Sequence, residues 1–271
     1  MIRNQLNRPL SNMTEQEREP GDEQELERSP SGAIIYRYDD AEPAKPAEFQ
    51  LAAGDEQAIE AISHHIEQHI GPISGVFHEL ISDLVHIDVH CVEPSADFPF
   101  HVLVTSGMSD LPMTVPEGAE DARYAELCVL LPSTWPVPGV GEVVGATGDW
   151  QSDEYYWPIE WLKYLARFPH EYQTWIGFGH TIPNGEEAEP FGPNTELGCM
   201  LLLPSMSLPE EFRELKVSED KTINFFCLYP LYKEEMEFKL QDGYEALMEK
   251  FDEYEVSDVI DPDRSNTAKA K

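Results

Sequence analysis

The stretch VHIDVH, residues 85–90, places residue types that can bind a metal at alternating positions. His86, Asp88 and His90 alternate with three β-branched residues. In a β-strand successive side chains point to opposite faces, so two imidazoles and one carboxylate would share a face. Imidazole and carboxylate groups are common ligands of zinc. The same alternation is typical of the polar face of any half-exposed strand, so both interpretations stay open at this point.

Two further histidines lie on a helix that is expected just before this stretch. In GDEQAIEAISHHIEQHIGP, residues 54–72, isoleucines recur at helical spacing, acidic residues open the segment and Gly-Pro closes it. His65 and His69 are one turn apart beside the isoleucine stripe, so they either border the apolar face or add ligands to the three residues of VHIDVH. A metal-dependent hydrolase using those five side chains is therefore the alternative function.

Motifs for other chemistry are missing from the sequence. It contains neither of the glycine-rich phosphate-binding patterns GxxxxGK[ST] and GxGxxG. Ser109, in SGMSD, lacks the second glycine of a nucleophile elbow. We therefore expect no enzymatic activity and no cofactor.

The charge of the chain restricts its partners. Its 271 residues include 18 basic and 52 acidic side chains, for a formal net charge of −34. A protein this acidic repels nucleic-acid backbones and anionic membrane surfaces, so neither is an expected partner. Complementary potential would instead accelerate association with a basic protein.

The N-terminal sequence and the cysteines indicate a cytoplasmic protein. The first twenty residues contain no apolar core of a secretory signal, and no apolar run approaches the ~18 residues that a membrane-spanning helix needs. The cysteines are scattered, form no CxxC pair and lie in apolar segments, which favours buried free thiols in a reducing compartment. They are Cys91, Cys128, Cys199 and Cys227.

The hydrophobic periodicity predicts an α+β fold, with a mixed β-sheet flanked by helices. Residues 1–30 are polar and are expected to be disordered, residues 31–260 to form a single domain, and residues 261–271 to be a disordered tail. A Gly/Pro-rich loop is expected over residues 133–156. The expected strands are 33–38, 82–94, 100–110, 123–132, 172–185, 198–204 and 222–232, the second and third forming a hairpin, and the expected helices are 54–72, 157–169, 233–240 and 243–254.

Aromatic residues concentrate between residues 157 and 191. Within this region TWIGFGH carries two glycines, and glycine in a strand often marks a bulge or the close approach of another backbone. A strand edge beside aromatic anchors is suited to the addition of a peptide strand. The sequence therefore predicts a protein-binding edge here, although most aromatic side chains in such a segment fill a core.

Four sequence blocks, in this order, resemble the suppressor of fused-like domain over roughly residues 50–255. They are HVLVTSGMSD, YAELCVLLPSTWP, WPIEWLKYLARFPHEYQTWIGFGHTIPNG and TINFFCLYPLYKEEMEFKLQDGYEALMEKF. The resemblance implies a mixed sheet flanked by helices, like the N-terminal domain of the animal protein, a non-enzymatic inhibitor that holds Gli-type transcription factors. It also implies a single-domain protein of the bacterial type, many of which are regarded as immunity proteins that bind toxins.

The resemblance implies a partner-binding segment at residues 167–180. Phe168 and Trp175 match positions where large apolar residues touch the partner peptide, and His180 matches a histidine at the end of the same strand. Tyr172 lies between them. Gly179 departs from the family, because the animal protein has a functional aspartate there. The sequence after HTIPNG is also too short for the second domain of the animal protein, so its two-domain peptide clamp is not expected.

These observations together predict a binding protein rather than an enzyme. The expected partner is another protein, with neutralisation of a basic toxin as one such role. The resemblance also favours a polar sheet face over a metal site for VHIDVH, since the family is not one of metalloproteins.

Overall fold

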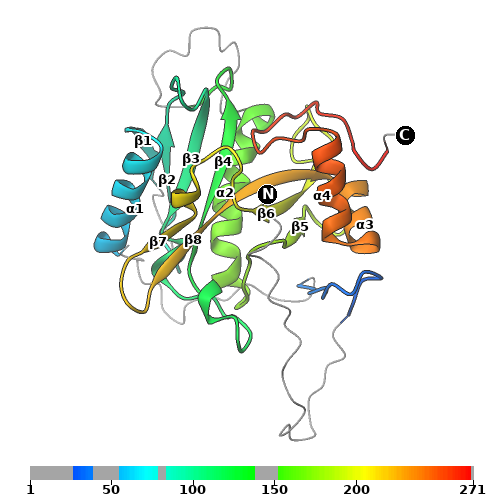
Figure 1. Ribbon diagram of the computed structural model, residues 1–271, viewed down its shortest axis with the longest axis horizontal. Coiled ribbons are helices and arrows are strands. Elements are labelled where there is room, and N and C mark those ends of the chain that lie inside the picture. The colour runs from blue at the N-terminus through cyan, green and yellow to red at the C-terminus, as the bar shows by residue number, and fades with distance from the viewer. Residues whose placement is uncertain (1–26, 39–54, 79–83, 138–151, 270–271) are drawn as a thin grey trace, which may run out of the picture.

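The computed structural model of the chain describes residues 27–38, 55–78, 84–137 and 152–269 (Figure 1). Most of the N-terminal segment predicted to be disordered (residues 1–26) and much of the predicted loop (138–151) lie outside the described residues. The strands are β1 Ile73–Phe77, β2 Asp88–Val92, β3 Phe100–Ser106, β4 Ala125–Pro132, β5 Thr181–Pro183, β6 Leu197–Leu203, β7 Glu214–Lys216 and β8 Thr222–Tyr232. The α-helices are α1 Glu56–His69, α2 Asp153–Glu171, α3 Lys233–Asp242 and α4 Tyr244–Glu253, and the short 3-10 helices are η1 Met108–Asp110, η2 Glu120–Ala122 and η3 Glu210–Arg213.

The described strands form one mixed sheet, which confirms the predicted fold class. Their order is β1-β2-β3-β4-β8-β6-β5, with β7 paired to β8. β2 and β3 form the predicted antiparallel hairpin. β4 and β8 run parallel, with Ala125 opposite Asn224.

Apolar side chains cover both faces of this sheet. Along β4, Leu127, Val129 and Leu131 belong to one buried cluster, while Cys128 and Leu130 belong to another. The first cluster includes the buried face of α2, and the second includes those of α1 and α4. The sheet is therefore the middle layer, with helices on both sides. The four cysteines are buried and free, as predicted.

Helices α1 and α2 differ in how closely they follow the sequence prediction. The α1 helix begins after Asp55, whose side chain accepts hydrogen bonds from two backbone N–H groups, and it buries Ile62 and Ile66 of the predicted isoleucine stripe. The α2 helix begins at Asp153, four residues before the predicted start, and it contains Pro158 and Pro169. Buried packing outweighs the backbone hydrogen bond lost at each proline: Trp157, for example, stacks on Phe191 with ring centroids 5.4 Å apart.

The predicted strand over residues 172–185 is wrong except for β5. Gln173 and Gly179 adopt positive φ angles of 50° and 77°, which extended backbone does not allow. The backbone N–H of Thr174 bonds back to the carbonyl of Pro169 at 2.9 Å, and that of His180 to Gly177 at 3.0 Å. Residues 172–180 are therefore a turn-rich connection from α2 to the sheet.

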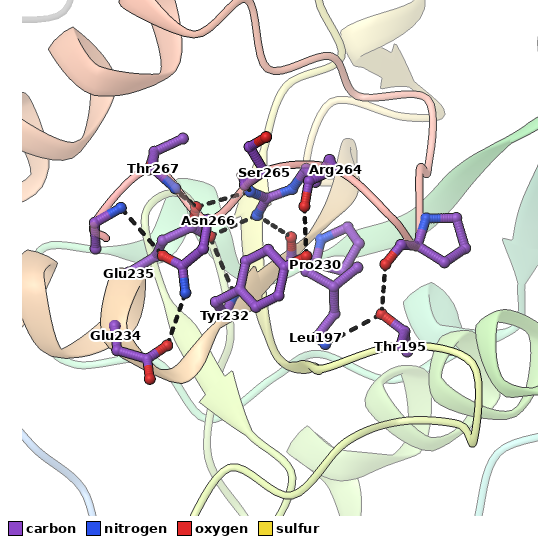
Figure 2. Close-up of polar contacts among 12 residues, drawn as sticks. Thr195, Leu197, Pro230, Tyr232, Glu234, Glu235, Arg264, Ser265, Asn266 and Thr267 are labelled. Atoms are coloured by element: carbon purple, nitrogen blue, oxygen red, sulfur yellow. Dashed lines mark hydrogen bonds and ion pairs between the residues drawn. The ribbon is translucent and has the colours of Figure 1, made fainter. Parts of the chain in front are cut away.

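The predicted disordered tail is wrong for residues 262–269. Arg264 contacts Glu235 of α3 through both guanidinium Nη atoms, at 2.7 and 2.5 Å, and it lies over the ring of Tyr232 (Figure 2). Thr267 is buried and donates its N–H and hydroxyl to the same carboxylate, each at 2.9 Å. A polar sequence can be ordered in this way when a buried partner satisfies its hydrogen bonds.

The predicted strand over residues 33–38 is also absent as such. Residues 27–38, hereafter the N-terminal arm, instead form a small hairpin in which Arg28 pairs with Ile34 by a single bridge. The N–H of Ile35 donates to the carbonyl of Glu27 at 2.8 Å, and Gly32 takes the positive φ of the turn. The apolar run AIIYRY therefore pairs with its own neighbour and not with the sheet.

Candidate functional site

The residues of VHIDVH form a polar network at the start of β2. The carboxylate of Asp88 lies between two imidazoles, 2.9 Å from Nδ1 of His78 and 3.1 Å from Nε2 of His86. His90 instead contacts the hydroxyl of Ser106 on β3, at 2.9 Å. Such carboxylate–imidazole contacts fit the interpretation as a hydrogen-bonded network.

The histidines of α1 do not join this network. Nε2 of His65 lies 3.1 Å from the carbonyl of Phe212, and its ring stacks on Phe212 and Phe225. His69 packs against His65 itself, with ring centroids 4.6 Å apart. Across the described part of the chain, no three His, Cys, Asp or Glu side chains gather as they would to hold a metal ion. The geometry thus gives the hydrolase alternative no support.

Glu126, on β4, was not singled out by its sequence context, yet it organises the loop SGMSD. Its buried carboxylate accepts hydrogen bonds from the hydroxyl of Thr105, the N–H of Gly107, and the N–H and hydroxyl of Ser109, at 2.6 to 3.0 Å. Burial raises the pKa of this carboxyl group above its ordinary value. A side chain with four donors around it holds the loop in one conformation. Asp110, which follows, accepts from the N–H of Asp55 at 3.2 Å.

Two of the five predicted partner-binding residues lie at the C-terminal end of α2. Phe168 is buried, and its ring lies 4.8 Å from that of the half-buried Tyr172. Tyr164, one turn earlier, packs on Phe168 at 6.0 Å and keeps 37% of its surface exposed. These three rings form an aromatic surface that is partly open to solvent.

The other three predicted residues lie in the connection to β5. Trp175 and His180 form a T-shaped pair with ring centroids 4.3 Å apart, and Trp175 packs against the core cluster beneath α2. Gly179 lies between them in the turn, and a Cβ atom there would meet nothing within 4 Å. Burial, with the nearby charge of Lys239, lowers the pKa of His180 to about 4, so this imidazole is neutral at pH 7. Trp175 and His180 are both half-buried.

β5 is the outermost described strand on its side of the sheet. Gly179, His180 and Asn184 direct backbone hydrogen bonds inward to β6. By alternation, Thr181 and Pro183 direct theirs outward, and proline has no N–H to offer. A strand added at this edge would therefore meet few backbone donors, so side chains must supply most of any binding energy.

A buried lysine lies beside this edge. Lys239 of α3 is 8% exposed, and within the described residues its ammonium has one hydrogen-bond contact, to the hydroxyl of Thr181 at 3.5 Å. Burial lowers its pKa. A buried ammonium with a single hydrogen-bond contact loses more hydration than its contacts replace, so it lowers stability. Such a group often marks a functional position.

Replacing Lys239 with methionine is expected to raise the free energy of unfolding by about 1 to 2 kcal/mol, because an apolar side chain of similar volume needs no hydration. Urea unfolding at pH 7 would measure it. Lys233→Met, at a lysine paired on the surface with Glu187, is the control and should change stability little. Destabilisation by Lys239→Met would show instead that the ammonium is well satisfied.

Sequence reasoning missed two parts of this surface. Tyr38 of the N-terminal arm packs edge-on against Phe168 and Tyr172, at 5.1 and 5.4 Å. Phe178, in the predicted segment but not selected, is 43% exposed and packs on Tyr244 of α4 at 5.3 Å. Its place in the run of aromatic residues was the available signal, whereas nothing in the local sequence links Tyr38 to α2.

None of the helices among the described residues is both long and apolar enough to cross a lipid bilayer.

Comparisons with known proteins agree with this architecture. The family model described as suppressor of fused protein (SUFU) matches residues 83–265. No curated protein matches the sequence. A solved suppressor of fused homologue from Neisseria gonorrhoeae is 19% identical, with a TM-score of 0.55 over 79% of this chain and 96% of the other. At this level of identity, the match shows that the two proteins share a fold.

Two further solved structures share the fold. One, described as the Sufu–Fu complex, is 13% identical, with a TM-score of 0.54 over 81% of this chain and 93% of that chain. Drosophila Suppressor of Fused is 14% identical, with a TM-score of 0.55 over 78% of this chain, but the match spans about half (51%) of the Drosophila chain. Because the family model covers most of the sequence, the chain belongs to the suppressor of fused family.

Proposed function

We propose that this chain is a non-enzymatic protein-binding module whose partner binds where α2 leads into β5. The observation that carries the proposal is a group of aromatic side chains around that edge of the sheet, of which all but Phe168 are at least partly exposed. Tyr164, Phe168 and Tyr172 flank it on the side of α2, and Phe178 lies on the side of α4. Aromatic residues at the centre of an interface commonly supply most of its binding energy.

The family relationship supports a protein as the partner. One structure of similar fold is described as a complex of Sufu with Fu, so at least one protein of this fold binds another protein. The proposed contact residues remain Phe168, Tyr172, Trp175, Gly179 and His180, the first two at the end of α2 and the other three in the connection to β5.

The charge supports a basic partner. With a net charge of −34, the protein would attract a basic protein over long range, and the association rate would fall as salt is added. We propose that this chain acts in the cytoplasm as a binding protein, and that its specific role is to neutralise a basic toxin. Nucleic acid and membrane surfaces are not proposed partners, because both carry negative charge.

The test is affinity capture from the native cell with matched variants. Phe178→Asp removes an exposed anchor and is expected to weaken capture by tenfold or more. Met206→Asp is the control, because Met206 is 73% exposed on a different loop. Circular dichroism and thermal unfolding must show both variants folded. Trp175 is a poorer choice, since its packing on His180 ties it to the fold.

A partner retained by the wild type and Met206→Asp but lost by Phe178→Asp would support the surface. Equal retention by all three would refute it. Loss of binding in 0.5 M salt, with recovery at low salt, would support the basic partner.

A further inference from the structure

The N-terminal arm is anchored to α3 at one end. The N–H of Ser31 donates to the carbonyl of Leu240 at 3.1 Å, and its hydroxyl to the carbonyl of Lys239 at 3.3 Å. Both carbonyls belong to the last turn of α3, where the carbonyl of Lys239 also accepts the N–H of Gly243, at 2.9 Å. Figure 1 shows the arm, in blue, below α3. The arm thus caps a helix end through a single serine.

The other end of the arm is anchored to α2. Besides its two edge-on contacts with Phe168 and Tyr172, Tyr38 shares a hydrogen bond of 2.6 Å with the hydroxyl of Thr174. Aromatic contacts of this geometry favour one defined position of the ring. Tyr38 therefore covers two residues of the proposed contact surface.

The two anchors lie on opposite sides of the sheet. Side chains of α3 pack against the cluster shared with α1 and α4, whereas Tyr38 packs against the cluster beneath α2. Lys239 of α3 in turn reaches Thr181 of β5. The arm therefore passes from one face to the other around the sheet edge that β5 forms.

Most of the arm is held loosely between these anchors. Ile34 and Tyr36 are 38% and 44% exposed. The ion pair between Arg37 and Glu27, at 2.7 Å, links the two ends of the arm to each other. Few buried contacts and exposed backbone are the marks of a segment that opens locally, without global unfolding.

We propose that the N-terminal arm is a displaceable strap that occupies the partner surface with Tyr38 and must detach before the partner binds. The proposal that the arm competes with a partner rests on the proposed function, whereas the proposal that the arm detaches does not. A tethered segment competes at high effective concentration, so the partner's apparent affinity is its intrinsic affinity multiplied by the fraction of molecules in which the surface is free.

The test measures detachment in the full chain without any partner. Amide hydrogen exchange at Ser31, whose N–H bonds to α3, and the rate of tryptic cleavage after Arg37 both report on release of the arm. Tyr38→Ala is expected to accelerate both about tenfold, because it removes two aromatic contacts and a hydrogen bond. Tyr36→Ala, on the same arm, is the control and should leave both rates unchanged.

A second variant guards against loss of the fold. Thr174→Val keeps the shape of the side chain, removes its hydroxyl and is expected to accelerate arm exchange roughly threefold. The proposal is supported if exchange rises in the arm while α2 and the sheet stay protected. It is overturned if both variants leave arm exchange unchanged, or if exchange rises equally in the arm, α2 and the sheet.

The regulatory step is tested separately with the captured partner. Tyr38→Ala should increase retention severalfold, whereas Phe178→Asp should decrease it. If the arm detaches as expected but Tyr38→Ala leaves retention unchanged, competition at this surface is refuted. If Phe178→Asp has no effect on capture, the proposed function fails while the exchange result stands.

Discussion

Arg264→Ala is expected to lower the free energy of unfolding by about 3 to 5 kcal/mol, because it leaves a buried carboxylate without its cation. Glu235 is fully buried, and both of its oxygens contact the guanidinium. The N–H groups of Tyr232 and Thr267 supply further hydrogen bonds but no charge. Urea unfolding of the full chain at pH 7 would measure the loss.

The matched control is Lys269→Ala in the same C-terminal segment. Lys269 pairs with Glu234 at 2.8 Å, but both side chains are exposed, so the expected cost is at most about 1 kcal/mol. Equal costs for the two variants would contradict the special role of the buried pair.

Lowering the pH should reduce the difference in free energy of unfolding between Arg264→Ala and the wild type. Burial alone would raise the pKa of Glu235, but the hydrogen bonds and charge of Arg264, with backbone N–H groups, lower it below the ordinary 4.5. In the wild type its contribution to stability is therefore present above pH 4.5 and is lost as the pH falls through the lowered value. In the variant, protonation removes the unpaired charge. A difference that is constant from pH 7 to pH 3 would contradict this account.

Glu126→Ala is expected to cost about 3 to 4 kcal/mol, because it leaves buried N–H and hydroxyl donors without an acceptor and opens a small cavity. The donors affected belong to Gly107 and Ser109, whose loop begins where β3 ends. A Cβ atom on Gly107 would lie 1.9 Å from the carbonyl oxygen of His86, so this loop cannot shift easily to find new partners. Urea unfolding again measures the effect.

Glu126→Gln is the matched control, with an expected cost of about 1 kcal/mol or less. Its carbonyl oxygen can accept from Gly107 and Ser109, and its amide can donate to the hydroxyl of Thr105. If Glu126→Gln costs as much as Glu126→Ala, then the ionised carboxylate itself is required.

The pH dependence of Glu126 has the opposite sign to that of Glu235. Burial raises the pKa of Glu126, so the folded state holds a proton that the unfolded state releases near pH 4.5. Its contribution to stability is therefore full below pH 4.5 and is lost as the pH rises through the raised pKa. The stability of Glu126→Gln relative to the wild type should increase with pH over this window. A relative stability that does not change with pH would contradict the raised pKa.

Local patterns in the sequence predicted most of the elements. The isoleucine spacing of α1 and the apolar runs of β4, β6 and β8 each carry their own periodicity, so these elements could be placed without knowledge of the fold. The errors have non-local causes. The tail at Arg264 is ordered by Glu235 on another helix, and α2 continues through Pro158 because the sheet buries its face.

The part of the candidate surface that depends on local structure could also be predicted from the sequence. Phe168 and Tyr172 lie one helical turn apart, so their proximity followed from the helix itself. Tyr38 lies more than a hundred positions earlier, and its contact with them depends on the path of the arm around β5. Tertiary packing places His65 and His69 of α1 away from the residues of VHIDVH, which the local sequence does not encode.

The parallel pairing of β4 with β8 affects how the chain folds during synthesis. β4 begins at Ala125 and its partner residues at Asn224, so the centre of the sheet cannot close until most of the chain has left the ribosome. Until then β4 presents an open edge, which is prone to pair with another copy. Nascent chains on one messenger lie close together, and an acidic sequence makes them repel each other. The acidity would then protect the growing polypeptide from its neighbours before any partner is met.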